Sequence, residues 1–262
     1  VSPVWVYIEP EASVDYSNSQ SNHCAINASD VYVDSNILQE CMDDGCGTEQ
    51  NPFKTITLAL QMIMPSEDNI VTLHLANGEY SPDTGEEFPL ILPDFIILEG
   101  ENEQLTILNA MQTARVIFIE NIFSSTISEL TIRGGLANLE TDGYYFSNGG
   151  GIYMFNSHCT LSNVTISSNH TTNSGNGGGI YASGSNAIDS CLELIGATIS
   201  ENSSTTGGGL YISNCDATLQ DVDIIGNSSQ REGGGLRISQ SSPICNSVVI
   251  SENFSVIGGG VY

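Results

Sequence analysis

The chain has 262 residues, of which five are lysine or arginine and 31 are aspartate or glutamate, so its formal net charge is −26. A surface this acidic repels nucleic acid and anionic membranes, which excludes both as expected partners. The hydrophobic runs are too short and too interrupted to span a bilayer. Seven cysteines favour an oxidising compartment, and therefore a secreted or cell-surface protein.

Residues 1–44 are predicted to form an acidic, loop-rich N-terminal extension. Its carboxylates include Asp30, Asp34, Asp43 and Asp44, and hard oxygen ligands of this kind suit Ca²⁺. However, the sequence contains neither an EF-hand loop nor a glycine-rich nonapeptide repeat. A solvated acidic segment without a cofactor is the favoured interpretation, and a bound Ca²⁺ is the alternative.

Residues 45–69 are predicted to form a capping segment with a helix at residues 52–64. Asn51 can cap this helix, Pro52 suits its first position, and Pro65 ends it. Apolar residues recur on one face of the predicted helix, at Phe53, Ile56, Leu60 and Ile63. A repeat protein needs a cover over its first unit, so we expect this helix to close the end of the array.

Residues 70–148 are predicted to form irregular first coils built from short strands. The strand candidates are Ile70–Leu75, Leu90–Leu92, Phe95–Leu98, Leu105–Leu108, Val116–Ile119 and Ile127–Ile132.

Residues 149–262 contain a repeat that begins with three glycines. The repeats start at Gly149, Gly177, Gly207, Gly233 and Gly258. The four complete repeats are 28, 30, 26 and 25 residues long, a period that is typical of a solenoid. Because the fifth repeat stops at Tyr262, we expect the array to be truncated there.

Each repeat has the composition of one coil of a parallel β-helix. Short runs rich in Thr, Val and Ile alternate with glycine corners of variable length, and no apolar ladder of helical spacing occurs in them. Stacked coils lie about 4.8 Å apart, so a position that recurs in each repeat forms a column. An Ile-x-x-Asn motif recurs in this way, and its amides are expected to form a structural ladder, at Asn169, Asn202, Asn227 and Asn253.

The repeats also resemble a known group of proteins. Gly149–Tyr153, which reads Gly-Gly-Gly-Ile-Tyr, and Leu161–Asn169 resemble secreted bacterial right-handed parallel β-helix proteins of the pectin-lyase-like superfamily. They are also similar to the repeats of chlamydial polymorphic outer-membrane proteins. The resemblance covers roughly residues 45–262 and implies an all-β, right-handed parallel β-helix. That superfamily includes enzymes and adhesins, so the resemblance does not choose a function.

Two pairs of cysteines are candidates for disulfides. Cys191 and Cys215 fall near one corner of successive coils, and Cys41 and Cys46 form a local pair. Because the number of cysteines is odd, at least one thiol is left over.

One row of residues follows the inward-facing position after the glycines. It consists of Tyr153, Tyr181, Tyr211, Arg237 and Tyr262. Alternation along a strand points these side chains outward, where aromatic rings can stack on sugars or contact a partner. The competing interpretation is that the rings simply pack against one another.

The sequence favours a non-catalytic adhesin or extracellular structural module that binds a glycan, another cell-surface protein or copies of itself. A polysaccharide lyase or glycoside hydrolase is the first alternative, and a filament subunit is the second. Arg237 with Asp221 or Asp223 is the best candidate for a catalytic cluster. A surface charge pair is the simpler interpretation of those three residues.

Overall fold

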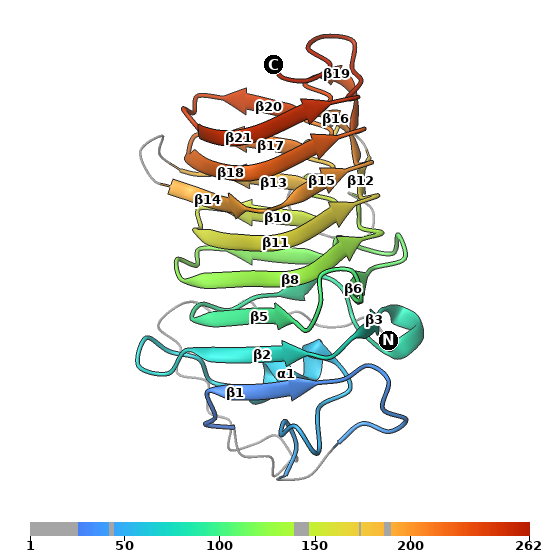
Figure 1. Ribbon diagram of the computed structural model, residues 1–262, viewed down its shortest axis with the longest axis vertical. Helices are drawn as coiled ribbons and strands as arrows, with labels where there is room; N and C mark the ends of the chain where they lie inside the picture. Colours follow the sequence, from blue (N-terminus) through green and yellow to red (C-terminus); the bar gives the residue numbers. More distant parts are fainter. Residues whose placement is uncertain (1–25, 42–44, 139–146, 173, 186–189) are drawn as a thin grey trace.

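The computed structural model describes residues 26–41, 45–138, 147–172, 174–185 and 190–262. The chain forms a right-handed parallel β-helix, in which successive coils stack from the N-terminal to the C-terminal end (Figure 1). Three parallel sheets run along the stack and enclose one elongated core. The predicted fold class is confirmed.

The long sheet has 11 strands. They are β1 (Asp30–Val33), β2 (Val71–Leu75), β3 (Gly78–Tyr80), β5 (Ile96–Gly100), β6 (Thr106–Asn109), β8 (Ser125–Arg133), β11 (Cys159–Ser167), β14 (Ser190–Ile195), β15 (Thr198–Ser200), β18 (Asp216–Ile225) and β21 (Ile244–Ser251). The long strands β8, β11 and β18 each cover two segments that are separate strands in other coils.

The second sheet has six strands and the third sheet has four. The second sheet contains β4 (Leu90–Ile91), β7 (Ile117–Glu120), β10 (Ile152–Phe155), β13 (Ile180–Ser183), β17 (Leu210–Ser213) and β20 (Leu236–Ser239). The third sheet contains β9 (Leu136–Ala137), β12 (His170–Thr171), β16 (Ser203–Thr206) and β19 (Ser228–Glu232).

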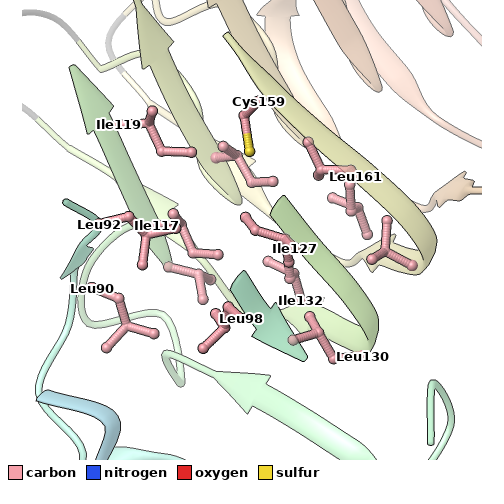
Figure 2. Close-up of a cluster of buried hydrophobic side chains, with 14 of the residues drawn as sticks. Leu90, Leu92, Leu98, Ile117, Ile119, Ile127, Leu130, Ile132, Cys159 and Leu161 are labelled. Atoms are coloured by element: carbon pink, nitrogen blue, oxygen red, sulfur yellow. The ribbon is translucent and has the colours of Figure 1, made fainter. Parts of the chain in front are cut away.

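Apolar side chains form columns inside the solenoid because equivalent residues of successive coils pair with each other. Leu161 pairs with Ile127 on one side and with Leu194 on the other. Across the interior, Ile117 and Ile119 of the second sheet face the long sheet (Figure 2). All five of these side chains have no exposed surface. Burial of such columns is the main stabilising contribution to a solenoid.

Six strands of the first coils agree closely with the sequence prediction, but β1, β3 and β9 were missed. β2, β4, β5, β6, β7 and β8 each fall within a few residues of a predicted strand. In contrast, β1 lies inside the segment predicted to be loop-rich, and it pairs in parallel with β2. Only Val31 and Val33 of β1 are buried, so the apolar signal is too short to stand out from its acidic surroundings.

The helix is shorter than predicted. α1 spans Ile56–Met62, and its cap is Thr55, whose hydroxyl accepts a hydrogen bond from the Leu58 amide. The buried Glu86 carboxylate also accepts hydrogen bonds from the backbone amides of Ile56 and Thr57, at 2.7 and 3.0 Å. Burial raises the pKa of Glu86, whereas these bonds oppose the rise. The predicted start at residue 52 is therefore wrong. The first backbone amides of the helix, which need partners outside it, are those of Ile56, Thr57 and Leu58.

Ile56 and Ala59 of α1 are buried in the core near the N-terminal end of the stack (Figure 1). A 3₁₀ turn, η2 (Pro82–Thr84), precedes Glu86. Within the described ranges, no helix is long and apolar enough to cross a membrane.

Candidate functional site

The outer face of the second sheet carries an almost continuous line of large side chains. Strand pairing places one residue from each coil directly above its equivalent in the coil before. We call this line the aromatic column, and it consists of Ile91, Phe118, Tyr153, Tyr181, Tyr211, Arg237 and Tyr262. The structure therefore brings together all five residues of the row predicted from the repeats.

The rings of the aromatic column stack face to face along the solenoid axis. Ring centroids lie 5.1 Å apart for Phe118 and Tyr153, and 5.4 Å apart for Tyr153 and Tyr181 and for Tyr181 and Tyr211. The interplanar angles are only 9°, 13° and 15°. Each inner ring thus has its faces covered by its neighbours. This agrees with the interpretation that the rings pack against one another. The inner rings present edges and hydroxyl groups rather than faces to a ligand, and ligand binding by this row stays a prediction.

Exposure varies along the aromatic column. Tyr153 retains only 5% of its surface, whereas Tyr262 keeps 46%. Tyr181 and Tyr211 are half-buried. Burial raises the pKa of Tyr181, and a hydrogen bond with the Ser183 side chain opposes the rise. Its phenol therefore stays protonated at neutral pH and can serve as donor and acceptor.

Two arginines lie against the aromatic column, although the chain has only five basic residues. The Arg115 guanidinium lies 5.0 Å from the Tyr153 ring centroid and 5.7 Å from that of Phe118. The Arg237 guanidinium lies 4.6 Å from the Tyr262 ring centroid, and its Nε is 3.1 Å from a Glu232 carboxylate oxygen. These contacts are favourable cation–π interactions, made by one buried arginine, Arg115, and one half-buried arginine, Arg237, that is ion-paired with Glu232.

Phe118 and Arg115 were missed by the sequence reasoning. They lie before Gly149, where the glycine motif that defines the register begins. A signal was present, because Phe118 follows an inward-facing isoleucine as Tyr153 does. Without the motif, however, the spacing to the next coil could not be known.

The four asparagines of the repeat motif form one buried column. The Oδ1 atoms of Asn202, Asn227 and Asn253 each accept from the backbone amide and the Nδ2 of the asparagine one coil before, at 2.8 to 3.0 Å. The Oδ1 atom of Asn169 accepts from the Gly135 backbone amide instead, at 2.8 Å. Each Nδ2 also donates to an isoleucine carbonyl. Asn169, Asn202 and Asn227 have no exposed surface, so these side chains lie inside the solenoid. This column is structural.

Disulfides join both candidate pairs of cysteines. Cys41 is bonded to Cys46, and Cys191 is bonded to Cys215 in the next coil. Cys159 and Cys245 are free thiols, the first buried and the second exposed. Burial raises the pKa of Cys159 to about 12, so this thiol is unreactive near neutral pH.

The acidic residues suggested for calcium have other partners. Asp30 contacts His74 and Ser29, and the Asp34 carboxylate accepts from the backbone and side-chain amides of Asn36. Asp43 and Asp44 lie outside the described residues. In the part of the chain that the structure describes, no three His, Cys, Asp or Glu side chains gather in a metal-binding group. Calcium binding by this segment stays a prediction.

The structure does not bring Arg237 together with Asp221 or Asp223. Arg237 is on β20 of the second sheet and bonds to Glu232. Asp221 and Asp223 belong to β18 of the long sheet, where both side chains are exposed. The catalytic cluster suggested by the sequence is therefore wrong, and so is the charge pair of the same residues, because β19 lies between the two strands and places them on different faces.

Three stacked sheets with recurring outward columns define the protein as a parallel β-helix repeat protein. The chain belongs to the family described as protein of unknown function (DUF1565), whose model matches residues 40–244. The resemblance to the pectin-lyase-like superfamily and the likeness to the chlamydial repeats stay predictions.

The structure is also similar to that of a pectin methylesterase mutant in complex with a hexasaccharide. The sequence identity is 17%, the TM-score is 0.45, and the match covers 84% of this chain and 67% of that chain. A comparison with curated proteins finds no match.

Proposed function

We propose that this chain is a secreted or cell-surface β-helix that binds an extracellular glycan without cleaving it, as an adhesin or a structural binding module does. The observation that carries the proposal is the aromatic column, which continues past every change of coil length. Extracellular location is supported by two disulfides and by the acidic composition.

The stacked rings determine how the aromatic column contacts a glycan. Ring edges carry partial positive charge, so the inner rings attract sugar oxygens at their edges rather than the apolar face of a sugar. The hydroxyls of Tyr181 and Tyr211 add one polar group per coil, and Arg237 can hold a ligand oxygen beside them. A polymer that lies along the solenoid meets several such contacts at once, so weak contacts add up to strong binding.

The test uses two double variants at Tyr181 and Tyr211. Tyr181→Phe with Tyr211→Phe keeps the ring stack and removes both hydroxyls, whereas Tyr181→Ser with Tyr211→Ser removes both the rings and the hydroxyls. On a glycan array, we expect the serine pair to weaken binding by about tenfold or more and the phenylalanine pair by a smaller factor. The two factors separate the contribution of the hydroxyls from that of the rings.

A matched control is Tyr32→Ser on the long sheet, where Tyr32 stacks on His74 with centroids 4.9 Å apart. This variant also loses one outward stacked tyrosine but should bind as the original chain does. Glycan binding at full strength by the Tyr181→Ser, Tyr211→Ser variant would contradict the proposal.

A further inference from the structure

The outer face of the third sheet contains a depression that is separate from the aromatic column. Strand pairing stacks His170, Ser203, Ser228 and Phe254 in one outward column. The two serines are small and lie between two ring-bearing side chains, which leaves a hollow above them. We call it the serine notch, and its outer lining is Ser203, Ser228, Gln230, Phe254 and Val256.

A β-bulge builds one side of the serine notch. Ser204 pairs with Ser229, but Thr206 pairs with Glu232, so β19 holds one residue more than β16 in this stretch. The extra residue lies at Gln230 or its neighbour Arg231, and the Gln230 side chain is exposed at the rim. Bulges of this kind redirect a side chain at the edge of a site.

The chemistry of the serine notch combines hydroxyls, one amide and an aromatic ring. The residues that line the notch are all uncharged, and Phe254 supplies the aromatic ring. The Ser203 hydroxyl is held 2.6 Å from Nδ1 of His170, and burial lowers the pKa of that histidine, which keeps the ring neutral. In the Nε2–H tautomer, Ser203 donates to Nδ1, and its oxygen stays available as an acceptor.

We propose that the serine notch binds one hexopyranose unit of a neutral glycan. Phe254 covers the apolar face of the sugar ring, and Ser203, Ser228 and Gln230 bond to its hydroxyls. His170 and Phe254 are three coil steps apart, about 14 Å, which leaves room for one sugar ring between them. An acidic sugar is disfavoured by the net charge of −26 and by the uncharged lining. This inference does not depend on the aromatic column, because it concerns another sheet.

The experiment is saturation-transfer NMR of the chain with methyl glucopyranoside, methyl galactopyranoside and methyl mannopyranoside. We expect at least one of them to bind. Ser203→Val with Ser228→Val fills the notch with side chains that suit an outward strand position, and it should weaken that binding by about tenfold or more. Phe254→Ser should weaken it similarly and changes only an exposed position, so it keeps the test valid if the valine pair folds poorly.

The control is Ser200→Val, an outward serine on β15 of the long sheet, which should leave glycoside binding unchanged. The proposal is overturned if none of the three glycosides binds, or if both notch variants bind as the original chain does. It is also overturned if the loss occurs only in the Tyr181→Phe, Tyr211→Phe variant. That last result would place sugar binding on the aromatic column and would leave the function proposed above intact.

Discussion

Asn202 connects its coil to both neighbouring coils through one side chain. Its Oδ1 accepts from the backbone amide and the Nδ2 of Asn169, and its Nδ2 donates to Asn227 and to the Ile166 carbonyl. A buried amide with every hydrogen bond formed stabilises the fold modestly, but its loss leaves buried donors without acceptors.

The first prediction concerns this side chain. Asn202→Ala should lower the free energy of unfolding by about 3 kcal/mol, because two buried donors of Asn169 lose their acceptor and a small cavity forms. Urea denaturation measures the change. Asn246→Ala, at an exposed position on β21, is the control and should change the free energy by less than about 0.5 kcal/mol. Equal effects of the two variants would show that the column does not stabilise the coils.

At the residue scale, residues that recur in every repeat could be identified from the sequence, whereas contacts between residues far apart in the chain could not. The asparagine column and the tyrosine row recur at one position of each repeat, so their alignment could be predicted. Glu86 could not be identified, because it lies 30 residues from the amide of Ile56 that it caps. The serine notch was missed for a similar reason, since its shape depends on a bulge between two strands.

At the scale of single elements, β1 is held to the long sheet by a chain of polar contacts across three strands. The His74 ring lies between Asp30 of β1 and Glu99 of β5, with nitrogen–oxygen distances of 3.0 and 3.1 Å. The hydrogen bonds with His74 and Ser29 lower the pKa of Asp30 below its usual value of 3.8. The lowered pKa means that the ionised form of Asp30 stabilises the folded state.

The second prediction follows from the sign of that shift. A lowered pKa in the folded state contributes stability above the unfolded pKa, and this contribution is lost as the pH falls through the folded pKa. Asp30→Asn should therefore lower the urea midpoint at about pH 6, and the difference should shrink as the pH is lowered from about 4 towards 2, because the carboxyl becomes protonated first in the unfolded and then in the folded state. If the urea midpoints of the variant and the original chain differ equally at the high and the low pH, the charge of the Asp30 carboxylate does not stabilise β1.

The elements themselves were predictable to different degrees. Strands β2 and β4 to β8 carry enough apolar residues to be identified from the sequence. The position of α1 depends on two partners: Thr55 and the distant Glu86. The amphipathic pattern alone extended the helix too far, because Phe53 and Ile63 are buried without being helical.

At the scale of the whole molecule, the stacked coils convert a repeated residue into a line on a face. The second sheet displays stacked rings and arginines, and the third sheet displays hydroxyls beside one exposed phenylalanine. These two faces bind different parts of a glycan if both proposals hold. A module that contacts a polymer on two faces holds it by several weak contacts rather than by one deep pocket.

The central claim is that the chain binds a glycan without cleaving it. The most direct test is co-sedimentation with an insoluble polysaccharide whose sugars are bound on the glycan array. The protein should appear in the pellet in a saturable manner, while the supernatant gains neither reducing ends nor unsaturated sugars over the same incubation. The serine pair at Tyr181 and Tyr211 should stay in the supernatant. Release of new sugar ends by the original chain, but not by a heat-unfolded sample, would contradict the claim and favour the polysaccharide lyase or hydrolase alternative.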